Sequence, residues 1–146
     1  MNRISIRNLQ TKIPVPQARI KNVVRQTLRY FRMTNAELSV VFVTEAHMKR
    51  LNSRHLNHKY PTDILTFDYR VSRKDPLLRA EIVLCPSVAM RNAHVFNTDV
   101  RQEIDRYLIH GILHLCGYDD NSPVEKSRMT GEEDRILGRL RRRPGA

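Results

Sequence analysis

An apolar run with two histidines four residues apart is the feature that most constrains this chain. Residues 110–120 read HGILHLCGYDD. Residues i and i+4 of a helix lie on one face, about 6 Å apart along the axis, so His110 and His114 can point at one metal ion. Gly117 suits the left-handed position that ends a helix, and the sequence YDDN then turns the chain back. A side chain from this turn can supply a third ligand and leave a fourth position for water, as in catalytic zinc sites.

A His-x3-His pair alone is weak support for a metal site, because two histidines on a helix often serve packing or hydrogen bonding. The run is similar to the His-Glu-x-x-His motif of metallohydrolases, but Gly111 stands where those enzymes carry their glutamate base. A metallopeptidase is therefore disfavoured, although it stays open as one alternative.

The length of 146 residues favours a single domain over residues 1–146, large enough for one hydrophobic core. No stretch approaches the roughly 18 apolar residues of a membrane span, and the N-terminus lacks the apolar core of a signal peptide. The two cysteines, Cys85 and Cys116, are too few for a disulfide framework. They indicate reduced thiols in a cytoplasmic protein.

The charge balance points to a polyanionic partner. Lys plus Arg number 26 against 15 for Asp plus Glu, a formal charge of +11. Such a charge on a small domain is typical of nucleic-acid binding, although a highly basic proteome would also account for it. Arginine outnumbers lysine about three to one, which favours phosphate recognition through its planar fork. We expect these arginines to form a positive groove that leads to the metal.

The periodicity of the chain predicts a compact α/β fold without internal repeats or linkers. Helices are expected over 14–31, 45–58, 86–97, 98–117 and 122–143, and strands over 36–44, 61–71 and 79–86, with a loop over 72–77. Thr98 is the expected N-cap of the helix that carries both histidines.

At residues 110–120 the chain resembles the YbeY endoribonucleases, also called rRNA maturation factors. Their signature is His-Gly-x-Leu-His-Leu-x-Gly-Tyr-Asp-His, from which this chain departs only at its last position, Asp120. The segments LNSRHLNHKYPTDILTF and AEIVLCPSVAMRNA are also similar to family segments, and Met129 and Glu133 fit the closing helix. The resemblance covers roughly residues 35 to 140, which makes it specific.

The resemblance implies an α/β fold with a small mixed sheet packed with helices. It also implies one zinc ion per chain, held on a helix and turn by three side chains, and cleavage of single-stranded RNA. The expected role is maturation of the 3′ end of 16S ribosomal RNA and ribosome quality control. The expected partners are the ribosomal RNA of the small subunit and small-subunit proteins.

Two departures from the family pattern concern the site itself. The third family ligand is histidine, and we expect Asp120 to replace it, because Asp119 matches the family's own aspartate. A carboxylate is an acceptable zinc ligand, but it should leave bound water less acidic than three neutral imidazoles would. The family also carries a catalytic arginine where this chain has Leu56; Arg54 or His58 is the expected substitute. The alternative interpretation is that His55 and His58 are ordinary exposed loop residues.

The sequence leaves two choices open. Either a zinc-bound water or the RNA 2′-hydroxyl can be the nucleophile. The competing function is a ribosome-associated RNA-binding factor whose zinc is only structural, which the charge and Leu56 both favour.

Overall fold

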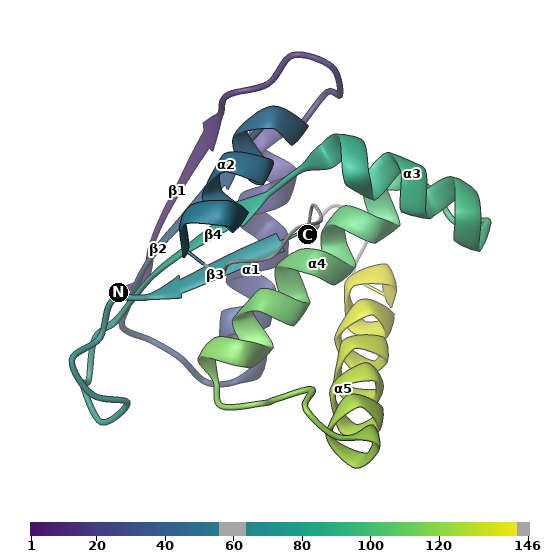
Figure 1. Cartoon of the computed structure of the whole chain (residues 1–146). Coiled ribbons are helices and arrows are strands. Elements are labelled where there is room, and N and C mark those ends of the chain that lie inside the picture. The colour runs from purple at the N-terminus through teal and green to yellow at the C-terminus, as the bar shows by residue number, and fades with distance from the viewer. Residues whose placement is uncertain (56–63, 143–146) are drawn as a thin grey trace.

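A computed structural model describes residues 1–55 and 64–142 of the chain. The strands in this part are β1 (Arg3–Asn8), β2 (Ala36–Phe42), β3 (Ile64–Asp68) and β4 (Leu78–Leu84). The helices are α1 (Gln17–Tyr30), α2 (Glu45–His55), α3 (Pro86–Phe96), α4 (Val100–Leu115) and α5 (Pro123–Arg142) (Figure 1). The prediction of an α/β fold with a small sheet is confirmed.

The strands form one mixed sheet in the order β1-β2-β4-β3. β1, β2 and β4 are parallel, and β3 pairs antiparallel with β4. Strand β1 was not predicted, although its sequence alternates. Ile4 and Ile6 are partly buried, whereas Arg3, Ser5 and Arg7 are exposed, as expected for an edge strand with one covered face.

The two faces of the sheet are covered by different helices. On one face, Leu38, Val40, Ile82 and other alternate residues are buried in a core shared with α1, α4 and α5. On the other face, Val41 and Val83 pack with Met48 of α2 in a smaller core. Figure 1 shows α5 lying against α4, on the side away from the sheet. Helix α4 is therefore held between the sheet and α5.

The start of α4 differs from the prediction. Asp99, not Thr98, is the N-cap, and its side chain accepts a hydrogen bond from the backbone N–H of Gln102 at 2.8 Å. The Thr98 hydroxyl instead donates to the Glu103 carboxylate at 2.8 Å. Aspartate is the better cap here because its charge also interacts favourably with the helix dipole.

Within the described residues, three helices are followed by a left-handed residue with the paired hydrogen bonds of a Schellman motif. These residues are Arg32 after α1, Asn97 after α3 and Gly117 after α4, with φ angles of 55°, 54° and 98°. After α4, the N–H groups of Gly117 and Tyr118 donate to the carbonyls of His114 and Leu113. The predicted role of Gly117 is confirmed. Glycine and asparagine are usual at this position, whereas the arginine found at position 32 is unusual there.

Candidate metal centre

His110 and His114 lie on the same face of α4, in its last two turns. Their Nε2 atoms are 3.1 Å apart, and the rings meet edge to face with centroids 4.7 Å apart. Both side chains are partly exposed, 27% for His110 and 31% for His114. The two nitrogens therefore face the same small volume and remain accessible to solvent.

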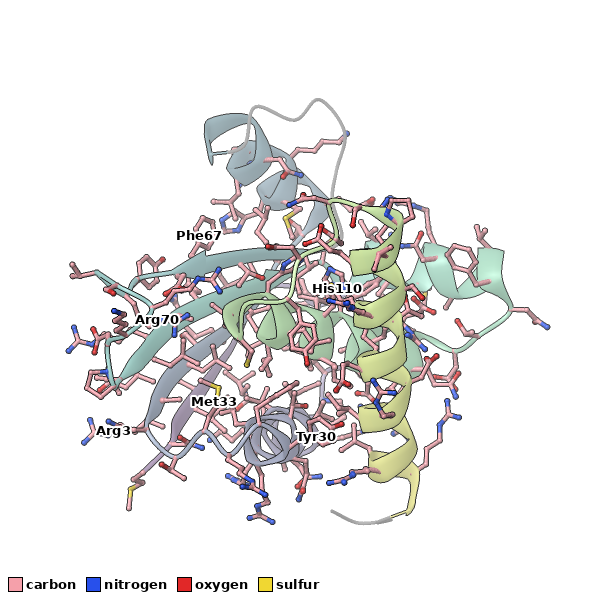
Figure 2. The ribbon with its side chains drawn as sticks, turned by 90° about the horizontal axis from the view of Figure 1, so that it is seen from below. Arg3, Tyr30, Met33, Phe67, Arg70 and His110 are labelled. Atoms are coloured by element: carbon pink, nitrogen blue, oxygen red, sulfur yellow. The ribbon has the colours of Figure 1, made fainter. Side chains whose placement is uncertain are left out.

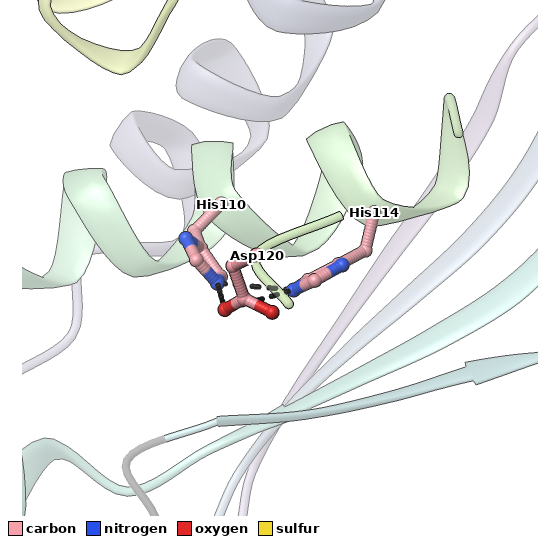
Figure 3. Close-up of side chains that lie close together, drawn as sticks. All are labelled: His110, His114 and Asp120. Carbon is pink, nitrogen blue, oxygen red and sulfur yellow. Dashed lines mark hydrogen bonds and ion pairs between the residues drawn. The ribbon is translucent and has the colours of Figure 1, made fainter. Parts of the chain in front are cut away.

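The turn that follows Gly117 brings Asp120 to the two histidines (Figure 3). Its Oδ2 atom lies 3.7 Å from Nε2 of His110 and 3.9 Å from Nε2 of His114. Asp119 is exposed and lines a separate hollow together with Arg128. Within the described residues, His110, His114 and Asp120 form a group whose ligand atoms all lie within 4.8 Å of one another.

Glu133 of α5 supports the first histidine. Its Oε2 atom lies 2.6 Å from Nδ1 of His110, and its side chain is only 7% exposed. The other carboxylate oxygen accepts a hydrogen bond from Arg106 at 2.8 Å, and Arg106 also contacts Asp134 at 2.9 Å. Glu133 thus offers one oxygen to each neighbour as an acceptor, so Nδ1 of His110 is the donor in this pair.

Nδ1 of His114 lies 3.0 Å from the backbone carbonyl of Tyr118. A carbonyl only accepts, so this nitrogen carries the proton as well. In the tautomer with the proton on Nδ1, each Nε2 atom carries a lone pair, and two such acceptors cannot hydrogen bond to each other. Two such lone pairs and a carboxylate oxygen converge on one point, an arrangement that a cation stabilises.

The distances fit a divalent metal ion. Ligand bonds of about 2.0–2.1 Å at tetrahedral angles put the donor atoms roughly 3.3 Å apart. The three observed separations of 3.1, 3.7 and 3.9 Å bracket this value. The donor set of two imidazoles and one carboxylate can hold such an ion from one side and leave its other side open to water or substrate.

Gly111 lets α4 approach the sheet closely. A Cβ atom at this position would lie 3.0 Å from Ile64 Cδ1, 3.1 Å from Ile82 Cδ1 and 3.2 Å from Thr66 Oγ1. The glutamate of a His-Glu-x-x-His peptidase has no room there. This packing removes the structural basis for the metallopeptidase alternative.

A second contact fixes the C-terminal end of α4. Arg70 donates to the Leu115 carbonyl at 2.8 Å and to both oxygens of Asp68, at 2.9 and 2.7 Å. The hydrogen bond from Arg70 is the main reason that the pKa of Asp68 lies below its usual range. The end of α4 is therefore anchored to the end of β3, just before the turn at residues 117–120 (the metal turn).

Cys116 packs beside the turn as a small apolar residue, as the sequence predicts. Its Sγ atom lies 3.5 Å from Sδ of Met33, and it is not in a disulfide. Burial raises the pKa of this thiol to about 11, and the nearby Arg70 and Arg73 offset only part of the effect. Cys116 is thus a neutral thiol at physiological pH.

The sequence placed His110, His114 and Asp120 in one site, and the structure brings all three together. Glu133 was identified only as a fit to the closing helix, and Arg106 was missed. Arg54 lies in the last turn of α2, and its side chain is outside the described part of the structure, as is all of His58. The continuous arginine groove stays a prediction.

Comparison with known proteins decides the family. A model of the family described as endoribonuclease YbeY matches residues 5–141. This chain belongs to the YbeY endoribonuclease family. The match extends well beyond the signature and includes residues 5–8 of β1, which the resemblance alone did not cover.

Relatives of this YbeY family member are similar over most of their length. Endoribonuclease YbeY of Syntrophus aciditrophicus is 32% identical over 139 residues, 92% of this chain and 87% of that protein. The Elusimicrobium minutum protein of the same name is 34% identical over 88% of this chain and 93% of its own. The solution structure of TM1509 from Thermotoga maritima superposes with a TM-score of 0.64 at 26% identity, covering 99% of this chain and 94% of that one. None of the described helices is long and apolar enough to cross a membrane.

Proposed function

We propose that this chain is a zinc-dependent endoribonuclease that cleaves single-stranded RNA, with the ion held by His110, His114 and Asp120. The observation that carries the proposal is the convergence of three acceptor atoms in a chain of the YbeY endoribonuclease family. The mixed nitrogen and oxygen donor set suits zinc. When bound, zinc lowers the pKa of water from about 15.7 towards 7 and polarises a phosphoryl oxygen, and hydrolysis of a phosphodiester needs both effects.

The chain's own residues have distinct roles in this proposal. Glu133 and the Tyr118 carbonyl hold the two imidazoles in the tautomer that presents Nε2. Arg54 or His58 supplies a cation that offsets the charge developing on the phosphorus oxygens. Either water or the RNA 2′-hydroxyl serves as the nucleophile.

The proposed biological substrate is the 3′ end of 16S ribosomal RNA, with a role in ribosome quality control in the cytoplasm. The net charge of +11 supports binding to ribosomal RNA next to small-subunit proteins. Unpaired RNA should be preferred, because splayed bases can be contacted, whereas an A-form duplex offers mainly shape and phosphate.

The test is cleavage of a labelled single-stranded RNA and of its duplex form. Wild type should cut the single strand faster, and His114→Ala should cut neither. His94→Ala removes an exposed histidine of α3, away from the metal centre, and should behave as wild type. Equal residual cleavage by wild type and His114→Ala would mean a contaminating nuclease, and the RNA-binding factor would then be the better account.

A further inference from the structure

A basic pocket of about 440 Å³ lies between the end of α1 and the last turns of α5. Its polar lining consists of Gln26, Arg29, Tyr30, Arg32 and Arg139, and its apolar part comes from α5. All three arginines are exposed. The metal centre contributes no residue to this basic pocket.

The charge of the basic pocket is not neutralised by its surroundings. No carboxylate is among its lining residues, and within the described part of the chain no ion pair joins the three arginines to an acid. The nearby Glu132 carboxylate accepts a hydrogen bond from the Tyr30 hydroxyl at 3.1 Å and is paired with Arg135. Three guanidinium groups that share one hollow repel one another unless an anion binds there.

Arg139 is already held in place for such a ligand. Its guanidinium carbon lies 4.8 Å from the centroid of the Tyr30 ring, within the range of a cation–π contact. The Tyr30 ring also packs edge to face on Phe31, with centroids 5.0 Å apart. Because Arg139 covers one face of the ring and Phe31 contacts it too, the basic pocket is built for a phosphate rather than for a stacked base.

Arg32 occupies a backbone position that disfavours it. It is the left-handed residue of the Schellman motif after α1, where its N–H donates to the Arg29 carbonyl and the N–H of Met33 donates to Leu28. The equivalent positions after α3 and α4 carry Asn97 and Gly117, the residues that tolerate this conformation. An arginine at such a position is a strained choice, which favours a role for its side chain.

The basic pocket is connected to the metal centre by direct packing. Phe31 contacts Tyr118 of the metal turn, with ring centroids 6.0 Å apart. Along α5, Arg139 lies six residues beyond Glu133, the partner of His110, which is about 9 Å along the helix axis. In Figure 2, Tyr30 and His110 both lie beside α5. One extended RNA strand can therefore reach both the basic pocket and the metal centre.

We propose that the basic pocket binds a backbone phosphate of the single-stranded RNA whose scissile phosphodiester lies at the metal centre. This inference rests on the proposed function for the identity of the anion. Arg29, Arg32 and Arg139 would converge on one phosphate through charge-assisted hydrogen bonds. The contact positions the strand and carries no base specificity.

The experiment measures binding of a fluorescent single-stranded RNA of about 12 nucleotides, in chelator so that the strand stays intact, as a function of salt. Arg29→Gln/Arg139→Gln should weaken binding about tenfold. It should also make the slope of log affinity against log salt shallower by about 0.7 for the lost phosphate contact. The control Arg7→Gln/Lys12→Gln removes the same charge from exposed residues on β1 and in the loop before α1. It should change both quantities much less.

A third variant separates binding from folding. Arg32→Gly should raise the midpoint of thermal unfolding, because glycine suits the left-handed position, and should still weaken RNA binding. A loss of stability cannot explain that combination. Equal weakening by the pocket and control variants would show only a general charge effect. Wild-type affinity in all variants would show that the basic pocket does not bind the RNA and would favour an acidic protein as its partner. Either result overturns the proposal. Cleavage by wild type in the same experiment, without chelator, reports on the proposed function separately.

Discussion

The Oε2 atom of Glu133 lies 2.6 Å from Nδ1 of His110, in a contact that joins α5 to α4 at the candidate metal centre. Carboxylates that accept from a metal-bound imidazole fix its tautomer and make it a stronger ligand. Glu133 is held in turn by Arg106. Helix α5 therefore orients His110 of the candidate centre without supplying a ligand itself.

Glu133→Gln should lower zinc affinity about 10- to 100-fold, because an amide orients the imidazole less firmly and withdraws the negative charge. Competition with a chromophoric chelator measures this affinity directly. Glu132→Gln, one residue away and directed at Tyr30 and Arg135, is the matched control and should bind zinc as wild type does. Equal affinities for both variants would show that the Glu133 contact does not support the ion.

Asp120→His restores the family ligand and removes one negative charge from the site. If the carboxylate holds the ion, the pH–rate profile of RNA cleavage should move to lower pH, because a neutral imidazole leaves the ion more positive. Asp119→His, with the same change at the adjacent exposed residue, should not move it. A profile and a zinc affinity that are both unchanged in Asp120→His would exclude Asp120 as a ligand.

Two glycine substitutions test how closely α4 approaches the sheet. At Gly131 of α5, an added Cβ would make only ordinary van der Waals contact with Arg135 nitrogens, at 3.7 and 3.9 Å. At Gly111 the same atom would meet three side chains at 3.0–3.2 Å. Both Gly→Ala changes gain the same helix propensity, about 1 kcal/mol. Gly111→Ala should therefore leave the protein about 1–3 kcal/mol less stable than Gly131→Ala in urea unfolding. Equal stabilities would mean that the helix is not tightly packed there.

The candidate ligands were more predictable than the contact that supports them. Local spacing in the sequence determines where the ligands lie, whereas tertiary packing determines which residues contact them. The i, i+4 histidines and the Gly117 turn bring three candidate ligands together within eleven residues. Glu133 reaches His110 from 23 residues away. Only the packing of α5 on α4 brings these two residues together, and no short-range pattern specifies that contact.

The same reasoning explains the errors in the fold. Strand β1 alternates correctly but is short and carries charged residues on its exposed face, so its pairing with β2 decides its structure. Thr98 and Asp99 are both good N-caps, and the choice between them depends on where the helix begins. The helices and strands β2, β3 and β4 followed from local sequence patterns.

The ion pair at the end of α4 predicts a specific acid sensitivity. The pKa of Asp68 is lowered in the folded state by Arg70, so its contribution to stability is present above the unfolded value of about 3.9. That contribution is lost as the pH falls through the folded pKa. Asp68→Asn should cost about 1 kcal/mol at neutral pH, a modest value because the pair is partly exposed. The difference from wild type should vanish in acid.

Urea unfolding of both proteins between neutral pH and about pH 3 measures this effect. Glu37→Gln, an exposed carboxylate on β2, is the control and should show a small difference throughout. A wild-type advantage over Asp68→Asn that persists below the folded pKa would assign the stabilisation to something other than the carboxylate charge.

The most direct test of the metal-dependent nuclease is a zinc titration of chelator-stripped protein, followed by the initial rate of cleavage of a labelled single-stranded RNA. The rate should rise with added zinc and saturate at about one equivalent per chain, as a single three-ligand site requires. His114→Ala should show no such rise. A full rate in the stripped wild type, or the same zinc-dependent rise in His114→Ala, would contradict cleavage through an ion held by His110, His114 and Asp120.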